Sequence, residues 1–181
     1  MPKTIFIMRH AKSSWAQSAM ADHERPLNKR GKRDAPKMGQ MLVARNLVPQ
    51  RLFYSSAQRT VMTARLLSEQ FHGETTVGGS IFDADSAEVV EDLYLAPWPT
   101  YIELMVGLSK RNAQAKLDSI MLLGHNPGIE WLLEKLTGQS HSVPTATIAH
   151  IEMKGDDWGD SAKLVSSGDY RMIDLWRPKE I

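Results

Sequence analysis

A short apolar run near the start of the chain, residues 4–8, ends directly in an arginine and a histidine, Arg9 and His10. A continuous apolar segment of this length predicts a strand that is covered on both faces of a sheet. In open α/β sheets, ligands bind at the carboxyl ends of the strands. Arginine offers a fixed fork of donors to phosphate oxygens, and histidine is a nucleophile or a base. For the pair alone, a structural ion pair with a carboxylate is as good an explanation as a catalytic site.

Strand and helix patterns alternate along most of the chain. The apolar patterning predicts strands at residues 4–8, 51–55 and 119–123 and an extended segment at 88–93. Helical spacing of apolar residues predicts helices at 28–45, 57–71, 101–111 and 129–136, and glycines mark a surface loop at 72–87. The segments 145–153 and 170–176 alternate as antiparallel or edge strands do. The order predicts an α/β fold, a three-layer αβα sandwich with a mainly parallel central sheet and antiparallel edge strands.

Composition sets limits on the class of protein. The 181 residues suit one domain, 1–181, and 22 Lys and Arg against 21 Asp and Glu leave a net charge of +1. This balance predicts no nucleic-acid partner and no anionic membrane partner. The absence of cysteine excludes disulfides and thiolate chemistry, and no His/Asp cluster has the spacing of a metal site. We therefore expect no metal and no cofactor, and, without a signal-like segment, a cytoplasmic protein.

Three of the predicted strands end in residues suited to phosphate chemistry. Arg9 and His10 follow the first strand, Arg59 lies in the first helical turn after the second, and His125 follows the strand at 119–123. The carboxyl ends of parallel strands share one edge of a sheet, so these four side chains are expected to converge. The helices that follow would point free backbone N–H groups at the same edge, which favours a bound anion.

Several short motifs of the chain resemble those of the histidine phosphatase superfamily, and in particular the small phosphohistidine phosphatases of the SixA type. The matching residues are Arg9-His10-Ala11-Lys12-Ser13, Arg25-Pro26-Leu27 with Arg30-Gly31 and Asp34-Ala35, Ser55-Ser56-Ala57-Gln58-Arg59-Thr60 with Thr63-Ala64, Leu93-Tyr94 with Ala96, and Gly124-His125-Asn126-Pro127-Gly128. Relatives usually carry glycine at position 11 and often proline at 57, where this chain has alanine. The resemblance implies a phosphoglycerate mutase-like fold without a sizeable cap insertion.

The resemblance also implies roles for individual residues. His10 would be the nucleophile that is transiently phosphorylated, and Arg9, Arg59 and His125 would bind the phosphoryl oxygens and offset their charge. Arg25, at a matching position in a loop, would reach the phosphate or the rest of the substrate. A surface arginine before a proline turn explains Arg25 nearly as well.

The general acid is the least defined part of the expected site. Relatives that cleave phosphate esters place a carboxylate after the third strand, where this chain has Glu91 and Asp92; Glu91 is slightly preferred as the catalytic acid. A solvated acidic turn explains the two residues equally well. A phosphohistidine substrate releases an imidazole, which needs less protonation than an alkoxide does.

We therefore predict a metal-independent phosphatase with a phosphohistidine intermediate, acting on phosphohistidine of a partner protein such as a signalling protein. The chain between Asp92 and His125 is too short for a lid, which favours an open site and a phosphorylated protein as substrate. One alternative is a small-molecule phosphomonoesterase or mutase of the same superfamily. Another is a non-catalytic phosphate-binding module, although such a pocket has no use for a nucleophilic histidine.

Overall fold

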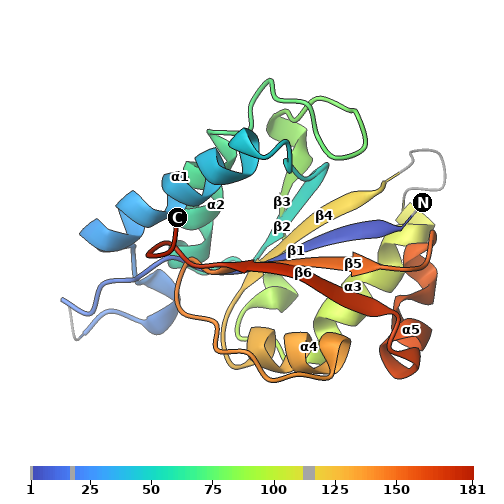
Figure 1. The fold of residues 1–181 in the computed structure, drawn as a ribbon. Coiled ribbons are helices and arrows are strands. Elements are labelled where there is room, and N and C mark those ends of the chain that lie inside the picture. Colours follow the sequence, from blue (N-terminus) through green and yellow to red (C-terminus); the bar gives the residue numbers. More distant parts are fainter. Residues whose placement is uncertain (1, 17–18, 112–116) are drawn as a thin grey trace.

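The computed structural model describes residues 2–16, 19–111 and 117–181 (Figure 1). Within these residues, six strands form one sheet in the order β3-β2-β4-β1-β5-β6. The strands are β1 (Lys3–Arg9), β2 (Arg51–Tyr54), β3 (Ala87–Val89), β4 (Ser119–Gly124), β5 (Ile148–Met153) and β6 (Tyr170–Trp176). The helices are α1 (Lys29–Ala44), α2 (Gln58–Ser68), α3 (Trp98–Arg111), α4 (Gly128–Thr137) and α5 (Ser161–Ser167).

The sheet is parallel on one side and antiparallel on the other. Strands β1, β2, β3 and β4 run in the same direction. β5 is antiparallel to β1, and β6 is antiparallel to β5 at the edge. Two of the predicted strands, β1 and β4, lie side by side in the centre, and every residue of β4 is buried. This arrangement confirms the predicted mixed sheet.

Helices cover both faces of the sheet, so the fold has three layers (Figure 1). The alternation of side chains along β1 divides its residues between two cores. Phe6 and Met8 pack with apolar residues of α1 and α2, whereas Ile5 and Ile7 pack with those of α3 and α4. The predicted αβα sandwich, with a phosphoglycerate mutase-like arrangement, is confirmed.

Several predicted boundaries are shifted. α2 ends at Ser68 rather than near Phe71, and α3 begins at Trp98 because Pro99, the second residue of the helix, is tolerated in a first turn. The extended segment expected at 88–93 is strand only to Val89. α5 was not predicted. The segment 72–87 is not entirely a surface loop, since it contains a buried phenylalanine and a short 3₁₀ turn.

The start of α1 is formed as expected. The side chain of Asn28 accepts a hydrogen bond from the backbone N–H of Gly31 at 2.9 Å, which satisfies one of the free donors of the first turn. Gly31 itself packs on the backbone of Lys12, in the loop that follows β1, and a Cβ there would overlap the Lys12 carbonyl oxygen. The Arg30-Gly31 motif therefore holds α1 close to the end of β1.

Two helical glycines differ in what surrounds them, and this difference yields a stability test. A Cβ at Gly128, the first residue of α4, would overlap the backbone oxygen of Ala96, whereas a Cβ at Gly107 in α3 meets nothing within 4 Å. We expect Gly128→Ala to lower the free energy of unfolding by roughly 2 kcal/mol or more, because backbone must move. Gly107→Ala, the matched control, should raise it by about 0.5–1 kcal/mol. Urea denaturation measures both, and equal effects would contradict this account.

None of the helices in the described part of the chain is long and apolar enough to cross a bilayer.

Candidate active site

The register of the central strands brings the predicted residues together. Arg9 at the end of β1 pairs with Gly124 at the end of β4, so His10 and His125 leave the sheet side by side. Their ring centroids are 5.1 Å apart. Arg59, in the first turn of α2, reaches the same edge, where one of its terminal nitrogens lies 3.2 Å from Nδ1 of His125. The convergence expected from a parallel sheet is present in the structure.

These side chains border an open cavity of about 240 Å³. Its lining includes five of the six residues predicted for the site: Arg9, His10, Arg25, Arg59 and His125. Lys12, Ser13, Trp15, Leu95, Asn126 and Thr145 complete the lining. Glu91 is not among these residues. Its side chain is exposed, in a 3₁₀ turn (Glu91–Leu93) that follows β3.

His10 is buried and held in one tautomer. Its Nδ1 lies 2.7 Å from the carbonyl oxygen of Ala11. Because a carbonyl oxygen only accepts, Nδ1 carries the proton and Nε2 keeps its lone pair. Burial, assisted by the positive charges of Arg59 and Arg9, lowers the pKa of His10 to about 3 and outweighs the hydrogen bond to Ala11, which raises it. At neutral pH, His10 is therefore an uncharged imidazole.

His125 is held in the opposite tautomer. Its Nδ1 faces the guanidinium of Arg59, which only donates, so Nδ1 accepts and the proton is on Nε2. Nε2 donates to the hydroxyl of Ser55 at 2.8 Å. Burial lowers the pKa of His125 to about 3, with further contributions from His10 and Arg59. His125 is thus neutral in the unliganded site, and an anion beside it would favour the protonated form.

Arg9 lines the cavity and has one buried donor without a partner among the described residues. One terminal nitrogen donates to the carbonyl oxygen of Val143 at 2.9 Å. Its Nε is buried and has no hydrogen-bond partner among the described residues. Burial is the main cause of the lowered pKa of this arginine. A buried donor without a partner is costly, so an anion that accepted from Nε would remove an existing penalty.

An acidic residue that was not predicted for the site, Asp22, lies beside Arg59 and Arg25. Its Oδ2 lies 2.9 Å from a terminal nitrogen of Arg59 and accepts from the hydroxyl of Tyr94 at 2.9 Å. Its Oδ1 accepts from Arg25 at 2.8 Å. Burial favours a higher pKa for Asp22, but the Tyr94 hydrogen bond and the two arginines outweigh it and lower the pKa to about 2. Asp22 is therefore ionised and joins the two arginines.

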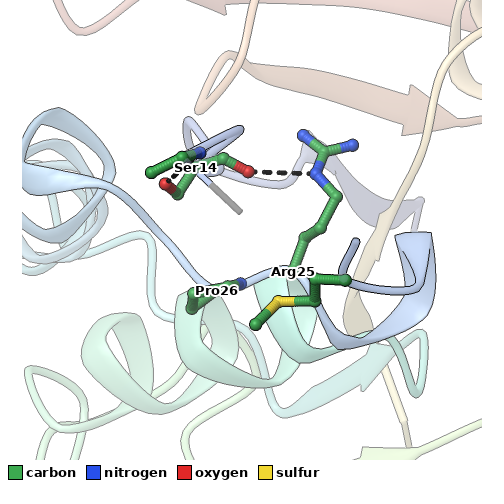
Figure 2. Close-up of a pocket in the computed structure, with 5 residues that line it drawn as sticks. Ser14, Arg25 and Pro26 are labelled. Atoms are coloured by element: carbon green, nitrogen blue, oxygen red, sulfur yellow. Dashed lines mark hydrogen bonds between the residues drawn. The ribbon is translucent and has the colours of Figure 1, made fainter. Parts of the chain in front are cut away.

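Arg25 organises the loop that follows β1. Its Nε donates to the carbonyl oxygen of Ser14 at 3.0 Å (Figure 2), and a terminal nitrogen donates to the hydroxyl of Ser13 at 2.6 Å. Its guanidinium carbon lies 3.3 Å from the ring centroid of Trp15. With a relative exposure of 7%, Arg25 is not the surface arginine that we considered as its alternative.

No group of three or more metal-ligating side chains occurs among residues 2–16, 19–111 and 117–181.

Known proteins are similar to this chain over most of its length. The model of the histidine phosphatase superfamily (branch 1) matches residues 5–78. An uncharacterised chloroplastic protein of Arabidopsis thaliana is 27% identical over 176 residues, which cover 97% of this chain and 78% of that protein.

Two solved structures establish the fold. The first, from Agrobacterium tumefaciens and assigned as the phosphohistidine phosphatase SixA, has a TM-score of 0.75 and 24% identity, and the match covers 98% of this chain and all of that one. The second, the protein histidine phosphatase SixA in complex with tungstate, has a TM-score of 0.75 and 20% identity, with 98% of both chains covered.

The cavity at the carboxyl edge of this sheet is lined by two histidines and three arginines, and together with the family match it identifies a phosphatase, a hydrolase. The family model spans β1, α1, β2 and α2, and so includes Arg9, His10 and Arg59. Residues 5–78 thus match the histidine phosphatase superfamily (branch 1), and the chain as a whole has the fold of the SixA structures.

Proposed function

We propose that the protein removes phosphoryl groups from phosphohistidine on a partner protein, through a phosphohistidine intermediate formed on His10. One observation carries the proposal. His10 lines the cavity as a neutral imidazole whose Nδ1–H is bound to the Ala11 carbonyl, which leaves the Nε2 lone pair available for attack. Nucleophilic catalysis requires this protonation state, and a module that only binds phosphate does not.

The reaction has two displacements at phosphorus. In the first, Nε2 of His10 attacks phosphorus, and the bond between phosphorus and the leaving nitrogen breaks, with its electron pair going to that nitrogen. In the second, water attacks phosphorus and the bond to Nε2 breaks, with its electron pair returning to Nε2. Dihydrogen phosphate, which keeps both protons of the water, is released. The expected donors to the phosphoryl oxygens are Arg9, Arg59 and His125, which all line the cavity. Their positive charge and fixed directions supply the stabilisation that phosphoryl transfer needs.

The acidic residues of the site favour a nitrogen leaving group. Glu91 is exposed and lies outside the cavity lining. Asp22 is ionised, with a pKa of about 2, so it cannot donate a proton at neutral pH. An alkoxide from a phosphate ester requires such a proton, whereas an imidazole titrates near pH 6.5 and leaves readily. The charge states therefore support phosphohistidine over a phosphomonoester.

The positive side chains also support a reaction without a metal ion. Arg9, Arg25 and Arg59 all line the cavity, and their charges offset that of a phosphoryl group. Only residues 90–97 connect β3 to α3, so we further propose a single domain, 1–181, without a cap over the cavity. An open cavity admits a side chain carried on another protein.

The test compares three substrates at equal concentration: a phosphohistidine-carrying protein, free phosphohistidine and p-nitrophenyl phosphate, each with and without EDTA. We expect the phosphohistidine protein to have the highest kcat/KM and EDTA to have no effect. A preference for phosphoglycerate or sugar phosphates, included as further substrates, would instead support the small-molecule phosphomonoesterase or mutase. Inactivation by EDTA that added metal reverses would contradict the metal-independent reaction.

A further inference from the structure

The mouth of the cavity carries two large apolar side chains that are exposed to solvent. Trp15 is 72% exposed and Leu95 is 54% exposed, and both line the cavity that contains His10. They come from separate segments, the loop after β1 and the turn between β3 and α3. Exposed large apolar residues that gather at a binding site mark contacts with a partner.

The Trp15 ring is exposed but held in place. Its face is covered by the guanidinium of Arg25 at 3.3 Å, and this guanidinium is fixed in turn by Ser13 and Ser14. Arg25 is also bound to the carboxylate of Asp22. A preorganised aromatic side chain loses little conformational entropy on binding, which is why such residues often dominate the energy of protein interfaces.

Leu95 occupies a conformation that is unfavourable for leucine. Its φ is 49°, in the left-handed region that L-residues with a Cβ seldom adopt. This conformation is unfavourable for a residue with a Cβ, and a glycine would avoid the strain. The burial of its side chain does not offset the strain, because more than half of that side chain is exposed. Strain of this kind is concentrated at binding and active sites.

We propose that Trp15 and Leu95 form the docking contact for the protein that carries the phosphorylated histidine. The occupant is a protein surface with apolar side chains beside the phosphohistidine. This inference rests on the proposed function and names the residues that select a protein over a small phosphate compound. Arg9, His10, Arg59 and His125 receive the phosphoryl group at the inner end of the cavity, so the rest of the substrate must pass Trp15 and Leu95 at the mouth.

The surface next to Trp15 fits such an occupant. A small hollow of about 110 Å³ lies beside Arg25 and is shown in Figure 2. It is lined by Ser14, Ala16, Met20, Arg25 and Pro26. Ser14, Arg25 and Pro26 are drawn around this hollow, with Arg25 bound to the Ser14 carbonyl. Arg25 lines both this hollow and the cavity. An apolar residue that flanks the phosphohistidine could therefore contact Trp15 and the hollow together.

Single alanine substitutions test this contact: Trp15→Ala and Leu95→Ala. The matched controls are Trp131→Ala and Ile81→Ala, whose side chains are 51% and 56% exposed and do not line the cavity. For each variant, kcat and KM are measured on a phosphohistidine-carrying protein and on p-nitrophenyl phosphate. We expect the loss of kcat/KM on the protein to exceed the loss on p-nitrophenyl phosphate by about tenfold, through a raised KM. The controls should show no such difference.

The other outcomes would each overturn a defined part of the proposal. Equal losses on both substrates would mean that Trp15 acts on the catalytic residues through Arg25, and Trp15→Phe, which keeps a ring against that guanidinium, should then restore both activities. An unchanged KM for the protein in both alanine variants would exclude the docking contact and leave the proposed function intact. If the wild-type protein does not hydrolyse the phosphohistidine protein at all, the proposed function fails, and the docking contact fails with it.

Discussion

Replacing His10 with alanine is expected to lower kcat by at least about 10³-fold while the protein still binds inorganic phosphate. The substitution removes the Nε2 lone pair that attacks phosphorus, so no covalent intermediate forms. The other phosphate-binding side chains stay in place, because none of their cited hydrogen bonds goes to His10. Arg9 donates to Val143, Arg59 to Asp22, and His125 to Ser55. Phosphate binding, measured by calorimetry, should therefore change far less than turnover does.

Trapping of the intermediate separates loss of the nucleophile from loss of the site. Rapid acid-free quenching of wild-type protein with labelled substrate should give a phosphorylated protein whose label is stable in base and labile in acid, and His10→Ala should give none. His72→Ala is the matched control, since His72 is exposed and does not line the cavity. Turnover retained by His10→Ala on every substrate would exclude His10 as the nucleophile. Loss of phosphate binding together with turnover would point to a collapsed site.

The central part of the site was predictable because it depends on backbone rules. Two apolar runs are the most regular patterns in the chain, and they are followed by Arg9 and His125. Parallel pairing of these two runs puts their last residues at one edge of the sheet, and the register Arg9 to Gly124 confirms this placement. The position of Arg59 was predictable for the same reason, because the N-terminus of a helix that follows a third parallel strand lies at the same edge of the sheet.

The outer part of the site was not predictable from periodicity. Asp22 lies in a polar loop without a repeating pattern, and the residues that define its role, Arg59 and Tyr94, are 37 and 72 positions away. The available signal was its spacing of three residues from Arg25, which is the pair it forms. The exposure of a side chain is also not visible in the sequence: nothing in the pattern around Trp15 indicates that the structure leaves most of this residue in solvent.

Glu91, the residue predicted as the general acid, does not line the cavity, and the reason is geometric. The prediction assumed an extended segment through residue 93, which would have carried Glu91 along the sheet. β3 instead ends at Val89, and the chain turns through a 3₁₀ segment that leaves Glu91 exposed. The next residue to reach the cavity is Leu95. A shift of a few residues at a strand end is enough to exchange a carboxylate for an apolar side chain at the mouth.

The free energy of unfolding is expected to fall by on the order of 4 kcal/mol between pH 7.5 and pH 5, because of His10 and His125. In the folded protein, burial lowers the pKa of each to about 3, whereas a histidine in the unfolded chain titrates near 6.5. Between these values the unfolded state binds protons that the folded state does not, so stability is complete above pH 6.5 and is lost as the pH decreases toward 3. His150, whose pKa is also lowered by burial, acts in the same direction.

Urea denaturation at pH 7.5, 6 and 5 measures this dependence. Asp22, with a pKa of about 2, contributes through its own titration only below about pH 4, so the range chosen reports on the histidines. His10→Ala should lose roughly half of the pH dependence, since His125 remains. Saturating phosphate should also flatten the dependence, because an anion between Arg59 and His125 raises the pKa of that imidazole toward its unfolded value. A wild-type stability that is constant from pH 7.5 to 5 would mean that both histidines accept protons in the folded state, and that His10 is not the uncharged nucleophile on which the proposed reaction depends.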